Sequence, residues 1–255
     1  MNLAGKTIIL TGARRIGQTV AEELAKKGAN LAITYRTAQT ESEAMCTACL
    51  ALGVKAEPFQ ADLSKEADIK RLVNDIKAKF GSIDGLVHMA ANYPKVPLSE
   101  VTMDNFTSTQ QIIGGSTLLL AKYLIPAMLE NTGDKTLGDP AGKIKGKIVL
   151  FSDWSALQKP YPEYLAYNMA KTGINSLTMA LALQYAPDIT VNAIAPGPIL
   201  MPPDLTEEEN KEALSGTPMA RWGGAEEIAK AVLYLMDSDF VTGVILPVDG
   251  GRTIS

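Results

Sequence analysis

Short runs of apolar and β-branched residues alternate with longer segments of helical periodicity along almost the whole chain. The predicted strands are Lys6–Leu10, Asn30–Tyr35, Val54–Gln60, Asp84–Ala90, Lys147–Ser152, Thr190–Ala195 and Val244–Val248. The predicted helices are Ile16–Lys27, Ala38–Leu52, Lys65–Phe80, Thr102–Glu130, Leu165–Tyr185 and Ala225–Met236. Alternation this regular predicts a parallel sheet with helices on both faces, in a single doubly wound α/β domain of the Rossmann type.

Two segments break the alternation. Residues 131–146 are rich in Gly, Asp and Lys and are predicted to form a surface loop. Residues 197–224 contain no strand pattern, and a segment of this length is predicted to cover a substrate. We see no linker or repeat, so one domain is predicted over residues 1–255.

The composition narrows the possible functions. A net charge of -4 and a pI of about 5.2 argue against nucleic acid as a partner, because such proteins need clustered Lys and Arg. No run of 18 apolar residues occurs, so neither a membrane-spanning helix nor a membrane partner is predicted. Cys46 and Cys49 are the only cysteines and His88 is the only histidine, so no metal site is expected. A cytoplasmic protein is predicted, since no disulfide framework is present.

The turn after the first predicted strand reads Thr11-Gly12-Ala13-Arg14-Arg15-Ile16-Gly17. Gly12 allows a tight turn, and Gly17 allows close contact between helix and strand. The helix that begins at Ile16 offers free N–H groups to a pyrophosphate. The motif therefore predicts a dinucleotide site, although an ordinary strand-to-helix turn has the same pattern.

The second predicted strand ends in Thr34-Tyr35-Arg36-Thr37, without an acidic residue. An NAD site usually places Asp or Glu here, to accept a hydrogen bond from the ribose 2′-hydroxyl. Arg36, together with Arg14 or Arg15, is instead predicted to pair with the 2′-phosphate of NADP(H). The alternative is that these arginines are solvated surface charges.

Tyr167 and Lys171 are spaced i,i+4 on a predicted helix, which places them on one helical face. A free tyrosine has a pKa of about 10, and a nearby ammonium is expected to lower it. The pair is predicted to act as an acid–base at a C=O or C=N bond. His88, near the end of a buried strand, is interpreted as a hydrogen-bonded structural residue rather than a base.

Together these residues resemble the short-chain dehydrogenase/reductase family over essentially the whole chain. The motifs that carry the resemblance are Thr11-Gly12 with Gly17, Asp62-Leu63, Tyr167 with Lys171, Asn192, Pro196-Gly197 and Val248-Asp249-Gly250-Gly251. The resemblance implies that Tyr167 is the acid–base and that Lys171 tunes it while holding the nicotinamide ribose. It also implies further cofactor contacts from Ile16, Asp62, Leu63, Ala90, Ala91, Pro196, Gly197 and Ile199, with Asp62 and Leu63 flanking adenine.

Within that family the chain looks most similar to the pteridine reductases. Arg15 stands at the usual middle glycine, Tyr35-Arg36-Thr37 is similar to their NADPH-selecting stretch, and Asp153 lies near the usual catalytic serine. The resemblance implies a pterin held between Tyr93 and the nicotinamide, with protons moving through Asp153 and Tyr167. Trp154, Tyr161 and Tyr164 are interpreted either as substrate-pocket residues or as packing for the helix start.

The chain also departs from the family pattern. The glycine loop is one residue shorter than is usual in the family, and the interval from Asp153 to Tyr167 is one residue longer than in typical pteridine reductases. Ser152 or Ser155 is an alternative third catalytic group. The family's Asn-Asn-Ala-Gly reads His88-Met89-Ala90-Ala91, and Ile112 or Ile113 replaces the usual asparagine of the long helix.

The leading prediction is an NADPH-dependent reductase of a small planar heterocycle or carbonyl, with a pterin as first candidate. The alternatives are a 3-oxoacyl-acyl-carrier-protein reductase or general ketone reductase, and a dinucleotide-binding sensor that does not catalyse. The two long helices carry more apolar surface than one sheet face needs. Because the family pairs these helices between subunits, a homo-oligomer (tetramer or dimer) is expected.

Overall fold

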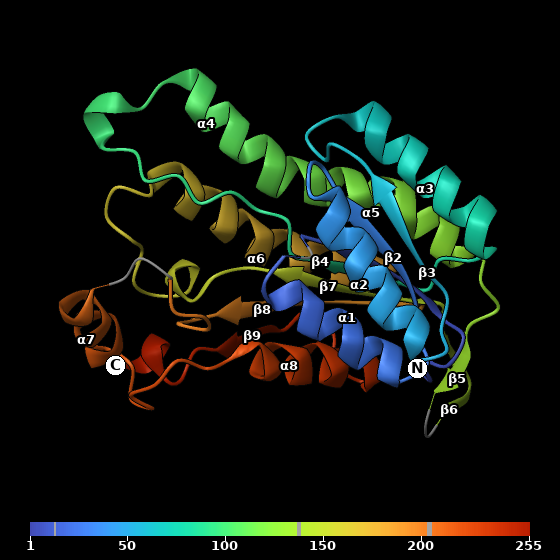
Figure 1. Ribbon diagram of the computed structural model, residues 1–255. Coiled ribbons are helices and arrows are strands. Elements are labelled where there is room, and N and C mark those ends of the chain that lie inside the picture. Colours follow the sequence, from blue (N-terminus) through green and yellow to red (C-terminus); the bar gives the residue numbers. More distant parts are fainter. Residues whose placement is uncertain (13, 137–138, 203–205) are drawn as a thin grey trace.

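One parallel sheet of seven strands organises the molecule, in the order β3-β2-β1-β4-β7-β8-β9 (Figure 1). The computed structural model describes residues 1–12, 14–136, 139–202 and 206–255. The strands of this sheet are β1 (Thr7–Thr11), β2 (Asn30–Tyr35), β3 (Ala56–Gln60), β4 (Gly85–His88), β7 (Gly146–Phe151), β8 (Ile189–Pro196) and β9 (Ile245–Val248). The doubly wound prediction is confirmed.

Helices cover both faces of the sheet, and each face has its own core. On one face lie α1 (Ile16–Lys26), α2 (Gln39–Ala51) and α8 (Ala225–Asp237), packed over residues such as Ile8 and Ile33. On the other lie α3 (Glu66–Phe80), α5 (Ser116–Leu129) and α6 (Leu165–Tyr185), packed over residues such as Leu86 and Val191. Strands apolar on both sides are what a parallel sheet of this kind requires.

The predicted loop over residues 131–146 is wrong in part. The structure has a two-stranded antiparallel pair there, β5 (Asp134–Thr136) with β6 (Asp139–Ile144), outside the main sheet. These two strands read DKT and DPAGKI, without the apolar β-branched run of the main strands, which is why their composition predicted a loop. Within the predicted substrate-covering segment, the structure has one helix among its described residues, α7 (Glu207–Ser215).

The predicted helix over residues 102–130 is one continuous helix with an irregular centre. Helix α4 (Met103–Gln110) passes into a π-helical turn, η2 (Gln111–Gly115), and then into α5. Among the described residues, Met103–Leu129 is the one helix long and apolar enough to span a membrane by length and composition. Half of its most apolar window is buried within the protein, as in a core helix.

Four short 3-10 or π turns complete the described elements: η1 (Leu98–Glu100), η2, η3 (Trp154–Ala156) and η4 (Arg252–Ile254). The carboxyl ends of β1, β2 and β4 meet where the chain reverses its direction across the sheet. Ligands of doubly wound folds bind at such a switch point. The fold therefore brings the glycine turn, the end of β2 and the residues after β4 to one place.

Candidate active site

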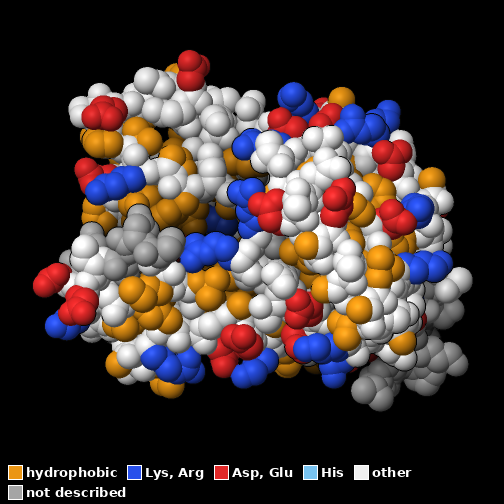
Figure 2. All heavy atoms as spheres, viewed as in Figure 1, with side chains coloured by type: hydrophobic (Ala, Val, Ile, Leu, Met, Phe, Trp, Pro, Cys, Tyr) orange, Lys and Arg blue, Asp and Glu red, His pale blue; other side chains and the backbone are white. Residues whose placement is uncertain are grey.

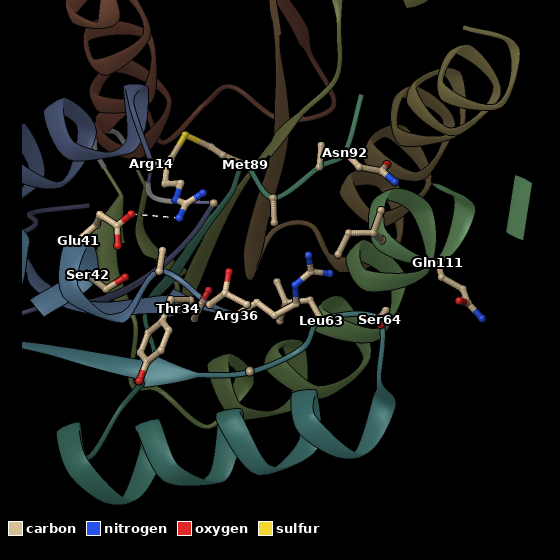
Figure 3. Close-up of a pocket in the computed structure, with 18 of the residues that line it drawn as sticks. Arg14, Thr34, Arg36, Glu41, Ser42, Leu63, Ser64, Met89, Asn92 and Gln111 are labelled. Atoms are coloured by element: carbon tan, nitrogen blue, oxygen red, sulfur yellow. Dashed lines mark hydrogen bonds and ion pairs between the residues drawn. The ribbon is translucent and has the colours of Figure 1, made fainter. Parts of the chain in front are cut away.

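A cavity of about 570 Å³ opens at this switch point (Figure 3). Seven of the predicted cofactor residues line it: Gly12, Arg14, Tyr35, Arg36, Leu63, Ala90 and Ala91. Residues that the sequence did not single out also line it, among them Glu41, Ser42, Ser64, Asn92, Ser108 and Gln111. They come from loops, from the first turn of α2, from the end of α4 and from η2, and they belong to no motif, so only the three-dimensional arrangement identifies them.

The glycine turn fits a dinucleotide closely. Gly12 has φ +70, and a Cβ there would lie 2.6 Å from the backbone nitrogen of Ala90. Only glycine leaves that space open. The N-cap of α1 makes no side-chain cap hydrogen bond, so its N-terminus can face an anion, although the N–H of Gly17 already donates to the Arg14 carbonyl.

Arg15 itself points elsewhere than predicted. It is the N-cap of α1 with φ 58, the left-handed backbone that usually requires glycine. Its guanidinium donates to the backbone carbonyl of Met201 at 3.4 Å, and Arg15 is not among the residues lining the cavity. Of the two predicted partners for Arg36, the structure places Arg14 at the cavity.

The rim around Arg36 contains both signs of charge. Arg14 Nη2 lies 3.0 Å from the Glu41 carboxylate, and Figure 3 shows Arg14 between Glu41 and Arg36. Asp62 does not line the cavity but lies beside it, where its Oδ1 accepts from the backbone and hydroxyl of Ser64. These hydrogen bonds hold the pKa of the Asp62 carboxyl below its usual value.

Asn92 offers a second sign of fit. Its Oδ1 is buried at the cavity and has no hydrogen-bond partner in the described part of the chain. A buried acceptor without a partner costs free energy unless a ligand or water satisfies it. At Gly12 the backbone leaves a ligand the room that a side chain would fill, and at Asn92 an oxygen left unpaired by the described residues can accept a hydrogen bond from a ligand.

The predicted acid–base residues Tyr167 and Lys171 do not line this cavity; Tyr167 contacts Tyr93, which directly follows the lining residue Asn92. Tyr167 donates its phenolic hydrogen to Asp153 Oδ2 at 2.7 Å. The other oxygen of Asp153 accepts from the backbone N–H of Ser155 at 2.8 Å, which fixes the carboxylate. Burial, followed by the charge and hydrogen bond of Asp153, raises the pKa of Tyr167 above that of a free phenol.

The expected lowering of that pKa by Lys171 is therefore wrong for the chain alone. Lys171 Nζ donates to the Phe151 carbonyl at 2.7 Å and lies 5.6 Å from the centre of the Tyr167 ring, over its face rather than at its hydroxyl. Burial lowers the pKa of Lys171 to about 8, partly opposed by the charge of Asp153. The i,i+4 spacing predicted that both residues share one helical face, but it could not predict the burial that raises the pKa of Tyr167.

Ser152 and Ser155, the two alternative third catalytic groups, make no hydrogen bond to the Tyr167 hydroxyl among the described residues. Ser152 donates to Asn175 on α6, away from the phenol. The hydroxyl of Ser155 is buried and has no hydrogen-bond partner among the described residues. Of the three candidates, the structure brings Asp153 to Tyr167.

Aromatic side chains form one wall beside Tyr167. Tyr93 stacks on Tyr164 at 4.2 Å between ring centroids and meets the Tyr167 ring edge-on at 4.7 Å. Tyr161 packs against both Tyr93 and Trp154 and accepts a hydrogen bond from the Trp154 indole. Figure 2 shows this face hollowed between the α4 and α7 regions, with hydrophobic side chains inside the hollow.

His88 is fully enclosed behind the site. Its Nδ1 lies 2.6 Å from the Thr11 hydroxyl and its Nε2 3.0 Å from the Ser116 hydroxyl, which itself donates to the Ile112 carbonyl in η2. Burial lowers the pKa of His88 to about 3, so the ring is neutral. The interpretation as a structural histidine agrees with this geometry.

The remaining predicted residues are spread along the same edge. A Cβ on Gly197 would lie 2.6 Å from the backbone of Asp249, so this turn and the C-terminal turn touch. Ile199 lines a second cavity of about 350 Å³, between the turn after β8 and that after β9. Pro196 ends β8, Ile16 begins α1, and neither lines the larger cavity.

Cys46 and Cys49 are free thiols buried in the core. Burial raises their pKa values to about 12 and 11, which leaves both thiols protonated at neutral pH. Their role is packing.

Comparison with known proteins agrees with this architecture. A family model described as enoyl-(acyl carrier protein) reductase matches residues 12–253. Glucose 1-dehydrogenase 2 of Bacillus subtilis is 31% identical and covers 99% of this chain and 96% of its own length. A 2,5-dichloro-2,5-cyclohexadiene-1,4-diol dehydrogenase of Sphingobium indicum is 34% identical, with 99% and 98% covered.

Solved structures give the same result. The short-chain dehydrogenase/reductase of Serratia marcescens matches with a TM-score of 0.88 at 27% identity, over 99% of this chain and 100% of that one. A blue fluorescent protein from a metagenomic library, in complex with NADPH, matches at 0.87 with 28% identity and 99% of both chains covered. An NAD+-bound xylitol dehydrogenase matches at 0.85 with 25% identity, over 98% and 100%. The chain belongs to the short-chain dehydrogenase/reductase family of oxidoreductases, which bind a nicotinamide dinucleotide.

Proposed function

We propose that this chain is an NADP(H)-dependent reductase of a small planar heterocycle or carbonyl, with a dihydropterin as the first candidate substrate. The observation that carries the proposal is the hydrogen bond from Tyr167 to Asp153 beside the aromatic wall of Tyr93. A proton donor next to flat aromatic rings suits a planar substrate with a C=N or C=O bond.

The cofactor assignment is supported by charge at the end of β2. Arg36 and Arg14 line the cavity, and residues 34–37 contain no carboxylate that could accept from a ribose hydroxyl. A guanidinium pairs well with a phosphate dianion, since its N–H groups match the phosphate oxygens. The residues that would hold the dinucleotide are Gly12, Arg14, Arg36, Leu63, Ala90 and Asn92.

A nicotinamide held by the cavity residues would supply a hydride to the carbon end of the substrate double bond. Tyr167 donates its proton to the nitrogen or oxygen end. The raised pKa of Tyr167 keeps the phenol protonated before transfer, which suits the reductive direction. Asp153 orients the phenol by accepting its hydrogen bond and is proposed to pass protons to it, and Lys171 is held in reach of the Tyr167 ring.

The segment predicted to cover a substrate contains α7 and is linked to the aromatic wall through Arg252. Arg252, near the C-terminus, donates to the carbonyl of Ala213 in the last turn of α7 and to the hydroxyl of Thr217. Its guanidinium lies 4.7 Å from the Trp154 ring centroid, so the covering segment is tied to the aromatic wall. We propose that the described part of residues 197–224 shields the substrate from water; residues 203–205 of this predicted segment lie outside the described residues.

Other functions remain open to test. The named relatives oxidise alcohols of sugars or cyclic diols by name, which favours an alcohol dehydrogenase as the second candidate. A 3-oxoacyl-acyl-carrier-protein or general ketone reductase would rely on a serine where Asp153 stands. A non-catalytic sensor would have no use for the Tyr167–Asp153 pair.

The test is a steady-state assay that follows nicotinamide absorbance. NADPH is offered with dihydrobiopterin, dihydrofolate or an acetoacetyl thioester, and NADP+ with glucose. We expect NADPH oxidation with at least one pterin at a higher kcat/KM than with the thioester. Turnover of glucose alone would support the second candidate, and cofactor binding without turnover of any substrate would support the sensor.

A further inference from the structure

An ion pair occupies the rim of the cofactor cavity on the side of β2. Arg14 Nη2 and Glu41 Oε1 are 3.0 Å apart, and both residues line the cavity. Figure 3 draws this pair with a dashed line between the two side chains. Arg14 comes from the glycine turn and Glu41 from the first turn of α2, so the pair spans the entrance between them.

The pair has no evident structural need. The two side chains are 65% and 57% exposed, and an exposed ion pair contributes little to stability. The Arg14 side chain has no other hydrogen bond among the described residues. Its guanidinium is therefore available to a ligand, at the cost of leaving Glu41.

The surroundings of the pair would otherwise attract an anion. Arg36 lines the same rim, and the N-cap of α2, Ala38, provides no side-chain cap for the first N–H groups of the helix. The buried Ser42 also lines the cavity. Glu41 is the one carboxylate among the described residues that line this cavity.

A carboxylate at this position acts differently on the two forms of a dinucleotide. A 2′-phosphate dianion is repelled by Glu41 and competes with it for Arg14. A ribose 2′-hydroxyl carries no charge, and a carboxylate can accept its hydrogen bond. Glu41 thus disfavours the phosphorylated form and tolerates the unphosphorylated one.

We propose that Glu41 is a specificity-determining residue that narrows the preference of this enzyme for NADP(H) over NAD(H). The inference deepens the proposed function and rests on its placement of the 2′-phosphate beside Arg14 and Arg36. Because both members of the pair are exposed and screened, the effect is expected to be about three- to fivefold.

The test compares binding of NADP+ and NAD+ to the full chain by isothermal titration calorimetry. The variant is Glu41→Gln, which keeps the size of the side chain and removes its charge. The matched control is Glu43→Gln on the same helix, which makes the same change in net charge outside the cavity, where Glu43 accepts from Gln39. Thermal unfolding of each variant checks that the fold is kept.

We expect Glu41→Gln to tighten NADP+ about three- to fivefold while the Kd for NAD+ stays the same or rises. Glu43→Gln is expected to leave the ratio of the two Kd values unchanged. Equal shifts for both cofactors, weaker NADP+ binding, or an equal effect of Glu43→Gln would overturn the inference.

The experiment distinguishes failure of the NADP(H) assignment from failure of the inference about Glu41. If the wild-type chain binds NAD+ more tightly but Glu41→Gln moves the ratio toward NADP+, the inference stands and the NADP(H) assignment falls. If the wild-type chain prefers NADP+ and Glu41→Gln does not move the ratio, the inference falls alone. Arg36→Ala serves as the test of the assignment itself, because it should weaken NADP+ far more than NAD+.

Discussion

Burial and one neighbouring carboxylate, Asp153, together raise the pKa of the Tyr167 phenol. Considered alone, the spacing of Tyr167 and Lys171 predicts a tyrosine whose pKa is lowered by a nearby ammonium group. The structure instead directs the phenolic hydrogen to Asp153, and the ammonium of Lys171 to a backbone carbonyl. Both features keep Tyr167 protonated, which makes it a proton donor at rest rather than a base.

The Asp153→Asn variant tests that role. The amide keeps the shape and can still accept from Tyr167, but it carries no charge and cannot take up a proton. We expect kcat to fall by about 100-fold or more, with the Kd for NADPH unchanged. Ser155→Ala is the control, because the Ser155 hydroxyl has no partner among the described residues, and it should stay near wild-type activity. An equal loss in Ser155→Ala would assign the role to the serine.

His88 gives the molecule a predictable pH response. Its pKa is lowered to about 3 when folded, against 6.5 when unfolded, so between these values only the unfolded chain takes up the proton. Stability must therefore decrease as the pH falls below about 6.5. From pH 7 to 5.5 the free energy of unfolding should drop by about 1 kcal/mol from this residue.

Because the chain has one histidine, the contribution can be isolated. Urea unfolding at pH 7 and 5.5 should show the drop for the wild type and its loss in His88→Gln, even though that variant is less stable throughout. Ring ¹⁵N shifts of wild-type His88 offer a check that needs no variant, and they should remain those of a neutral imidazole at pH 5. A ring that is protonated at pH 5 would contradict the enclosed geometry.

At the scale of elements, periodicity predicted the main sheet and its helices well, with α6 and β2 matching at both ends. It missed η2, because one wider turn hardly changes an apolar pattern over 27 residues. It also missed β5 and β6, because their polar residues, with Pro and Gly in β6, lack the apolar pattern of the main strands. Glu41, Ser42 and Asn92 escaped notice because their place at the cavity depends on how helix starts and loops converge.

The contact between the β1 turn and the end of β4 gives an element-scale prediction. In Gly12→Ala, a Cβ at φ +70 would meet the Ala90 backbone nitrogen at 2.6 Å, and backbone cannot move aside cheaply. We expect a loss of more than about 3 kcal/mol in stability and weaker binding of dinucleotide.

Gly81→Ala separates backbone strain from the clash. Gly81 also has a positive φ, +89, but nothing lies within 4 Å of the place that an added Cβ would take. This variant should lose only about 1 kcal/mol and bind cofactor normally. The account of the Gly12 turn is wrong if the two variants behave alike in thermal unfolding and in cofactor titration.

At the scale of the whole molecule, one face of α6 carries an apolar stripe. Four exposed apolar residues lie on this face because their spacings are close to multiples of a helical turn: Leu165, Met169, Met179 and Leu183. Leu183 is the most exposed of them, at 87%. Leu118 on α5 is exposed as well. We propose that this stripe pairs two copies of the chain in a homo-oligomer.

Leu183→Glu should break that pairing, because it places a charge in an apolar interface. Light scattering after size exclusion should show an oligomer for the wild type and a smaller species for the variant. Leu50→Glu on α2, also at an exposed leucine, is the control and should leave the mass unchanged. A monomeric wild type, or an unchanged mass for Leu183→Glu, would rule out this interface.

The most direct test of the whole account is NADPH oxidation in the presence of dihydrobiopterin, measured for the wild type and for Tyr167→Phe. The phenylalanine keeps the ring that packs against Tyr93 and removes only the hydroxyl that reaches Asp153. We expect turnover by the wild type, and loss of turnover in the variant with the Kd for NADPH unchanged. Turnover that survives in Tyr167→Phe, or a wild type that binds NADPH and reduces no planar substrate, would contradict the proposed role of Tyr167.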